Sequence, residues 1–103
     1  MIVRQWRGSA TPANADAYFH HVTGTVFPSL TGLAGHRGAY LLRRDVEDGV
    51  EFLAVTLWVS REAIHAFAGP DIDVAVVEPQ AHAVLKEADG FVKHYEVAFG
   101  ACR

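Results

Sequence analysis

The chain has little of what several common classes of protein require. Its 103 residues include a single cysteine, Cys102, so an internal disulfide is excluded and a thiol in the chain's tail is expected rather than a nucleophile. Nine Lys and Arg stand against twelve Asp and Glu, and no basic stripe is present, so we expect no nucleic-acid partner. No linker, repeat or low-complexity run divides the sequence, which predicts one domain over residues 1–103.

Long uncharged apolar runs are missing as well. Arg4 and Arg7 interrupt the first apolar stretch, "MIVRQWRG", which therefore reads as neither a signal peptide nor a membrane span. We expect a cytoplasmic protein without a membrane partner. Half of the residues are hydrophobic and 11% are aromatic, which is enough to build a folded core.

Periodicity and turn signals predict strands, helices and their order. Gly24 and Pro28 are expected to weaken and stop the first helix, Asp48-Gly49 predicts a hairpin turn, and Ser60 predicts a helix cap. A second helical piece over 71–89 is expected to break near Pro79. The remaining elements are strands at 1–8, 39–46, 50–60 and 91–99, and helices at about 12–26 and 61–69.

The order strand, helix, strand, strand, helix, strand predicts an α+β fold. It is the ferredoxin-like, split β-α-β plan, with a four-stranded antiparallel sheet in the order 4-1-3-2. Both helices cover the same face of that sheet, and the other face is left bare.

The third predicted strand is apolar on both sides, which raises the question of what covers the bare face. Phe52, Ala54, Thr56 and Trp58 alternate with a second apolar set. Leaving four aliphatic side chains exposed forgoes about 6–12 kcal/mol at roughly 1.5–3 kcal/mol each. A homodimer through this open face, forming a dimeric α+β barrel, is the simplest solution, although long side chains and the C-terminal tail could instead shield it within one chain. The second apolar set consists of Leu53, Val55, Leu57 and Val59.

Histidine offers the main titratable candidates. His20 and His21 are adjacent on a helix, so their side chains diverge, and no metal site is predicted because no cluster has ligand spacing. His65 is expected on a solvent-facing helical side. His94 shares a strand face with Glu96: below the helices it could accept a proton in a pocket, and otherwise it is a hydrogen-bonded histidine at the dimer seam.

Aromatic residues could form the walls of a cavity for a planar ligand. Trp58 follows the small residues Ala54 and Thr56 along the third strand, and a flat ring beside small neighbours can border such a cavity. The alternative is that these aromatics are simply core. Further candidate walls are Trp6, Tyr18, Phe19 and Phe67.

Three segments resemble the antibiotic-biosynthesis-monooxygenase-like family of dimeric α+β barrels. They are "TLWVSREAIHAFAG", the first strand "MIVRQWRG" and the final strand "FVKHYEV", and the resemblance spans nearly the whole chain. It implies the ferredoxin-like dimeric fold. It also implies one of several chemistries, because the family includes quinone-forming monooxygenases that use no cofactor and enzymes that degrade heme.

The heme-degrading branch carries an Asn on strand one, a Trp on the helix after strand three and a heme-ligating His further on. Here the corresponding positions hold Gln5, Phe67, and Val77 or Glu78. Glutamine can still donate a hydrogen bond, but neither Val77 nor Glu78 can ligate iron as an imidazole does. The resemblance therefore points to a member that uses no heme or other cofactor.

Two hypotheses of function follow. In the first, the protein is a cofactor-independent monooxygenase that acts on a small aromatic or polyketide-type substrate between sheet and helices. His94 is then the base, Gln5 the hydrogen-bond donor, and Trp58, Trp6, Tyr18, Phe67 and Thr56 bind the substrate. In the second, it is a non-catalytic homodimer that binds a small apolar or aromatic ligand.

Overall fold

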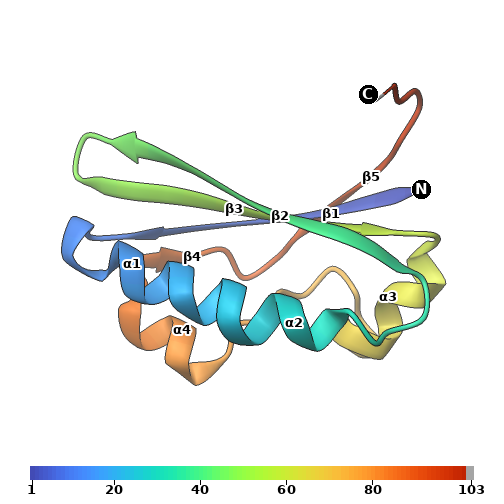
Figure 1. Cartoon of the computed structure of the whole chain (residues 1–103), viewed down its shortest axis with the longest axis horizontal. Coiled ribbons are helices and arrows are strands. Elements are labelled where there is room, and N and C mark those ends of the chain that lie inside the picture. Colours follow the sequence, from blue (N-terminus) through green and yellow to red (C-terminus); the bar gives the residue numbers. More distant parts are fainter. Residues whose placement is uncertain (102–103) are drawn as a thin grey trace.

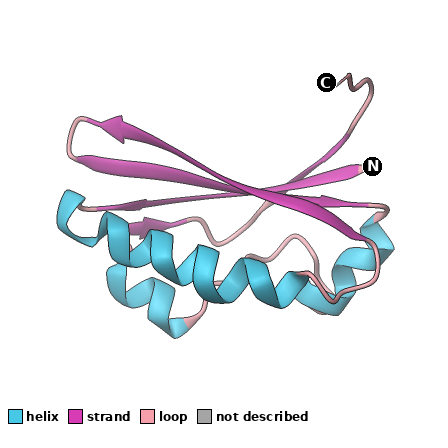
Figure 2. Cartoon of the chain, in the orientation of Figure 1, coloured by secondary structure: helices cyan, strands magenta, loops and turns pink. Residues whose placement is uncertain are grey.

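The computed structural model describes residues 1–101, so the predicted tail thiol at Cys102 lies outside the described residues. It shows one antiparallel sheet with every helix of the described chain on the same side (Figures 1 and 2). The strands are β1 (Ile2–Ala10), β2 (His36–Val46), β3 (Gly49–Trp58), β4 (Glu87–Ala88) and β5 (Lys93–Glu96).

The strand order confirms the predicted α+β, ferredoxin-like topology. The sheet runs β2-β3-β1-β4, and β5 also pairs with β1. The predicted fourth strand, 91–99, forms only as β5, and β4 along the same edge of β1 comes from residues that were predicted to be helical. β5 pairs with Ile2 to Gln5, and β4 pairs with Gly8 and Ser9. β3 lies between β1 and β2, as expected for the most apolar strand.

The register between the two central strands decides which side chains face the helices. Arg4 pairs with Thr56, and Trp6 pairs with Ala54. Because side chains alternate along a strand, the even-numbered residues of both strands lie on the helical side. Phe52, Thr56 and Trp58 are buried there, as the sequence predicted.

The first helical region does not end where Pro28 predicts. α1 (Pro12–His21) continues into a π-helical turn, η1 (Val22–Val26), and then into α2 (Phe27–Leu30). Pro28 lies in the first turn of α2, where its missing N–H is tolerated. Gly24 lies within η1. The expected helix stop is therefore wrong: these residues change the type of helix without ending it.

The predicted helix over 71–89 is also largely wrong. Only α4 (Pro79–Val84) is helical. Residues 71–78 instead run beside the chain before β5, where Ala75 N–H donates to Gly90 O at 2.9 Å and Val92 N–H donates to Asp73 O at 2.8 Å. After α4, Lys86 N–H donates to Ser9 O at 2.7 Å and starts the pairing of β4. Backbone pairing with neighbouring strands replaces the local helical bonds in both places.

The helix after β3 forms as predicted. α3 (Arg61–Ala68) begins at Ser60, whose Oγ accepts a hydrogen bond from Ala63 N–H at 3.2 Å, and closes at Gly69, which has a φ of 81°. His65 is exposed on it, as expected.

Two hydrophobic clusters lie between the sheet and the helices. The larger one gathers Trp6, Tyr18 and Phe52 with α1 and α4, and Tyr18 lies 4.8 Å from Phe52 between ring centroids. Phe19, a predicted candidate wall of the cavity, is exposed on α1, so that prediction is wrong. The smaller cluster lies near α3 and consists of Ile2, Leu30, Trp58 and Ile64.

The opposite face of the sheet carries no helix (Figure 1). Tyr40, Leu42 and Tyr95 are 60%, 48% and 50% exposed, and they project on this side together with the partly exposed Leu53 and Val55. None of the helices within residues 1–101 is long and apolar enough to cross a membrane.

Candidate functional site

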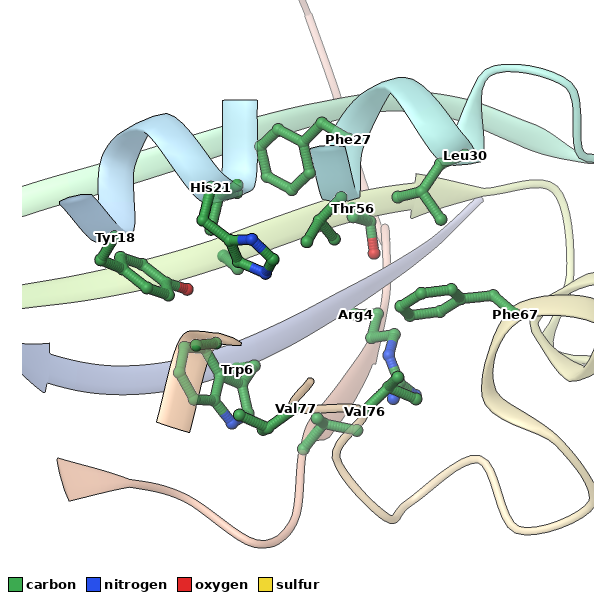
Figure 3. A pocket seen from close by; sticks show the side chains of 15 residues that line it. Arg4, Trp6, Tyr18, His21, Phe27, Leu30, Thr56, Phe67, Val76 and Val77 are labelled. Atoms are coloured by element: carbon green, nitrogen blue, oxygen red, sulfur yellow. The ribbon is translucent and has the colours of Figure 1, made fainter. Parts of the chain in front are cut away.

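A pocket opens on the helical side of the sheet where the two hydrophobic clusters do not meet. Its empty space is about 590 Å³ when the part open to solvent is counted. Its walls are mostly apolar, and its polar side chains are few, as is typical of sites for small molecules. Fifteen residues line it (Figure 3): Arg4, Trp6, Tyr18, His21, Val22, Val26, Phe27, Leu30, Ala54, Thr56, Phe67, Val76, Val77, Ala81 and Val92.

The π-helical turn η1 supplies one wall of this pocket. His21, Val22, Val26 and Phe27 line the pocket from the turn and its two ends. A π turn adds a residue to the helical repeat, so it changes which side chains face inward, and such turns often mark functional sites. In this chain Phe27, directly after the turn, packs against both hydrophobic clusters.

Arg4 is the charged residue of the pocket. It projects from β1 and is only 4% exposed. Its guanidinium donates hydrogen bonds to the backbone carbonyls of Ile72 and Val74, the latter at 3.2 Å, and its Cζ lies 5.7 Å from the centroid of the Phe67 ring. Burial lowers the pKa of Arg4, and the charge of Asp73 partly offsets that effect. The guanidinium nevertheless stays protonated at neutral pH.

His94 connects Arg4 to Asp73. The side chain of His94 is 4% exposed; its Nε2 lies 3.0 Å from Arg4 Nη1 and its Nδ1 lies 3.2 Å from Asp73 Oδ1. Because arginine can only donate, Nε2 accepts and Nδ1 carries the proton that Asp73 accepts. Burial and the nearby Arg4 charge lower the pKa of His94, against an opposing effect of Asp73. The neutral imidazole therefore holds Arg4 in place.

His21 has an unsatisfied ring nitrogen in the pocket. Its Nε2 is buried and has no hydrogen-bond partner among the described residues, and the nearest carboxylate oxygen, Glu78 Oε2, is 3.9 Å away. Figure 3 shows the ring pointing into the space between Tyr18 and Arg4. Burial raises the pKa of the Tyr18 phenol, so that hydroxyl stays neutral. A buried nitrogen left without a partner is unfavourable, and a ligand group could satisfy it.

Four of the residues predicted to bind a substrate come together here. Trp6, Tyr18, Thr56 and Phe67 all line the pocket. Trp58 lies behind this wall. It is fully buried in the smaller cluster, donates its indole N–H to Thr56 Oγ1 at 2.8 Å and stacks on Phe67 at 6.3 Å between centroids.

The two residues predicted for catalysis are placed differently. His94 lies on the helical side of the sheet, but Arg4 stands between it and the pocket. The carboxylate that contacts His94 is Asp73, from the segment before α4. Gln5 alternates with Arg4 and Trp6 along β1, pairs with Val55 and therefore projects on the open face of the sheet.

Sequence reasoning missed Arg4 and His21 as pocket residues. Arg4 carried a signal, since a charge within an apolar strand at an inward-facing position needs a partner. His21 carried a weaker one, because its direction depends on where the helix changes to the π turn. No group of three or more His, Cys, Asp or Glu within residues 1–101 is placed to hold a metal ion.

The pocket residues also show which side chains could ligate a heme iron. Val77 lines the pocket but has no ligating atom, and Glu78 lies at its edge beside His21. An imidazole able to ligate iron does reach the pocket, from His21 on α1 and not from positions 77–78.

Comparison with known proteins defines the class of fold. No known sequence family matches the chain. No curated protein sequence matches it. Solved structures do, and they are antibiotic-biosynthesis-monooxygenase-like proteins, so the chain has the fold of that group.

Three of these structures illustrate the range of the group. A Bacillus cereus protein provisionally described as an antibiotic biosynthesis monooxygenase matches with a TM-score of 0.67 at 15% identity, over 100% of this chain and 96% of that one. MhuD, a heme degrader of Mycobacterium tuberculosis solved with two hemes in its active site, matches with a TM-score of 0.63 at 24% sequence identity. The match covers 99% of this chain and 100% of that one. The ActVA-Orf6 monooxygenase of Streptomyces coelicolor, in complex with nanaomycin D, matches with a TM-score of 0.59 at 19% sequence identity. The match covers 99% of this chain and 90% of that one. At these identities the likeness establishes the fold alone.

Proposed function

We propose that the protein is a cofactor-independent monooxygenase acting on a small aromatic or polyketide-type substrate bound between the sheet and the helices. In such a reaction a phenol or enol loses a proton, and the electron-rich anion reacts with dioxygen. One oxygen atom enters the ring as a carbonyl and the other leaves as water. The protein has to bury the substrate, favour the anion and exclude other reactions.

The observation that carries this proposal is a buried cation in an apolar pocket. The Arg4 guanidinium lines the pocket beside Phe67 and bonds backbone carbonyls and His94. A positive charge near a buried phenol favours its ionised form, because the ion pair is poorly screened there. His94 and Asp73 would then act by positioning Arg4. The ActVA-Orf6 monooxygenase binds the ligand nanaomycin D, which supports a small-molecule substrate for a site of this fold.

Oxygen uptake on a panel of dihydroxynaphthalenes and anthrones tests the proposal. We expect quinone formation by the unmodified chain in the presence of a chelator. Val76→Trp should fill the mouth of the pocket and abolish turnover, whereas Ala66→Trp, at an exposed position of α3 outside the lining, should retain it.

Titration with hemin separates this reaction from heme chemistry. A heme absorption band that shifts on binding and is lost in His21→Phe would contradict a cofactor-free mechanism. No oxygen uptake with any compound of the panel would contradict the monooxygenase assignment.

A non-catalytic ligand-binding protein is the second candidate. It is favoured by one observation: the Nε2 atom of His94, the predicted base, is already occupied by Arg4. Tight binding of a panel member with a 1:1 stoichiometry but without oxygen uptake would support this function over the first.

We also propose that two copies associate through the open face of the sheet. The exposed side chains of Tyr40, Leu42 and Tyr95 form an apolar surface with Leu53 and Val55. A two-fold contact would cover the same surface on both copies. Charged residues adjoin this surface at one end, where Glu51 accepts hydrogen bonds from Arg7 and Arg44 at 2.8 Å each. An apolar centre with a polar rim is the usual anatomy of such an interface.

A further inference from the structure

The pocket presents two polar groups that a ligand could still engage: a guanidinium with no direct carboxylate partner, whose charge Asp73 offsets only in part, and a ring nitrogen with no hydrogen-bond partner among the described residues. One is the Arg4 charge, whose hydrogen bonds go to carbonyl oxygens and an imidazole and not to a carboxylate. The other is His21 Nε2, which has no partner. Apolar and aromatic side chains, among them Trp6, line the pocket with them. Arg4 belongs to the sheet and His21 to the helix above it.

Arg4 and His21 would each bind a different kind of ligand atom. A buried guanidinium without a carboxylate partner attracts an anionic oxygen, because charge-assisted hydrogen bonds are strong where water is excluded. A neutral imidazole nitrogen can accept a hydrogen bond from a hydroxyl group. The apolar walls between Arg4 and His21 suit a flat ring system.

We infer that the ligand of this pocket is a hydroxylated aromatic acid or acidic enol, with its anionic oxygen at Arg4 and a hydroxyl group donating to His21 at the other side of the ring. This inference rests on the proposed function for the location of the site and adds the class of substrate. His21 is then positioned to accept the proton of the ring hydroxyl, and Arg4 pairs with the anionic oxygen, which is either the ionised enol of the proposed reaction or a carboxylate that selects for the acid.

Calorimetric titration of the unmodified chain with four matched compounds tests the inference. 6-Hydroxy-2-naphthoate carries both groups at opposite ends of the ring system, 2-naphthoate lacks the hydroxyl, 2-naphthol lacks the carboxylate, and naphthalene lacks both. We expect 6-hydroxy-2-naphthoate to bind at least about tenfold more tightly than 2-naphthol, and about threefold to tenfold more tightly than 2-naphthoate.

Two variants assign the preferences to their residues. His21→Phe should abolish the difference between 6-hydroxy-2-naphthoate and 2-naphthoate while leaving the preference for the acid. Arg4→Lys keeps a charge, but its ammonium has only three N–H donors and cannot bond two carbonyls, His94 and a ligand at once, so it should weaken the preference for the acid. Since Arg4 also ties down residues 72 and 74, the four compounds on the unmodified chain carry the test if this variant does not fold.

The outcomes separate this inference from the proposed function. Equal affinity for 2-naphthol and 6-hydroxy-2-naphthoate, or no binding by any of the four at millimolar concentration, would overturn the inference. Selective binding of the hydroxy acid without oxygen uptake would support it and tell against monooxygenase activity.

Discussion

At the scale of single residues, the site depends on the chain Asp73, His94 and Arg4. The His94 imidazole accepts a hydrogen bond from Arg4 and donates one to Asp73. Only a neutral imidazole can do both, because a protonated ring has no accepting nitrogen. Protonation would turn Nε2 into a donor that faces the donor Arg4. Arg61 adds a further positive charge that opposes protonation, and Asp73 is the one group that favours it.

We predict that the free energy of unfolding falls as the pH drops below 6.5, the ordinary pKa of histidine. The folded pKa of His94 is lowered, so in the window just below 6.5 the unfolded chain binds more protons than the folded chain, and stability rises with pH there and levels off above it. Urea unfolding between about pH 5 and pH 7.5 measures this. His94→Gln should flatten the dependence, and His82→Gln, at an exposed position of α4, should leave it unchanged. The same pH dependence in both variants would remove His94 from this account.

Sequence patterns located the site's aromatic walls better than its polar groups. Trp6, Tyr18 and Phe67 could be placed because apolar periodicity reports which face is inward. The roles of Arg4 and His94 could not, because they depend on contacts with residues 72–74, about seventy and twenty positions away along the chain, respectively. For Trp58 the sequence correctly indicated burial but not its role, since burial alone does not distinguish a pocket wall from the core behind it.

At the scale of elements, the π turn η1 decides the shape of the pocket. It carries Gly24, which is exposed and has nothing within 4 Å of the place where a β-carbon would be added. The pair Gly24 and Pro28 was a signal of irregularity that favoured a helix stop, and local propensity alone cannot tell a stop from a change of helical repeat.

We predict that Gly24→Ala raises stability by about 0.5–1 kcal/mol, because glycine loses more conformational freedom than alanine in a helix. Thermal unfolding should show an increase of a few degrees. Gly8→Ala is the matched contrast: its new methyl group would collide with the indole of Trp6, so a clear loss of stability is expected. Loss of stability in Gly24→Ala would show that the π turn itself requires glycine.

At the scale of the whole molecule, the sheet with helices on one face was predictable in topology from the order of its elements. The hairpin forms next to the predicted place: its turn is Glu47 and Asp48, and Gly49 pairs with Val46 as the first residue of β3, without a positive φ. The central place of β3 follows from its apolar content. The short strand β4 was not predictable, because residues 71–89 have a helical pattern that backbone pairing with β1 and with residues 90–92 overrides. The topology could therefore be predicted from periodicity. The structure differs from that prediction where tertiary backbone pairing replaces a predicted helix.

We predict that the chain sediments at twice its mass of 11.2 kDa at micromolar concentration. Leu42→Glu should shift it toward the single-chain mass, since the two-fold contact would bury the new charge twice. Ala66→Glu, on the exposed side of α3, is the control and should not change the mass. A single-chain mass for the unmodified protein would mean that the open face stays uncovered in solution.

The buried guanidinium of Arg4 also has an evolutionary consequence. Replacing a buried charge and its partners by well-packed apolar side chains is often neutral or favourable for stability. In a lineage that no longer binds a ligand here, arginine at position 4 could be lost together with its partner His94, whereas methionine at position 4 alone would leave His94 Nε2 and the carbonyls of Ile72 and Val74 without this donor. The residue found at this position in descendants of the same ancestor would then record which of them still use the pocket.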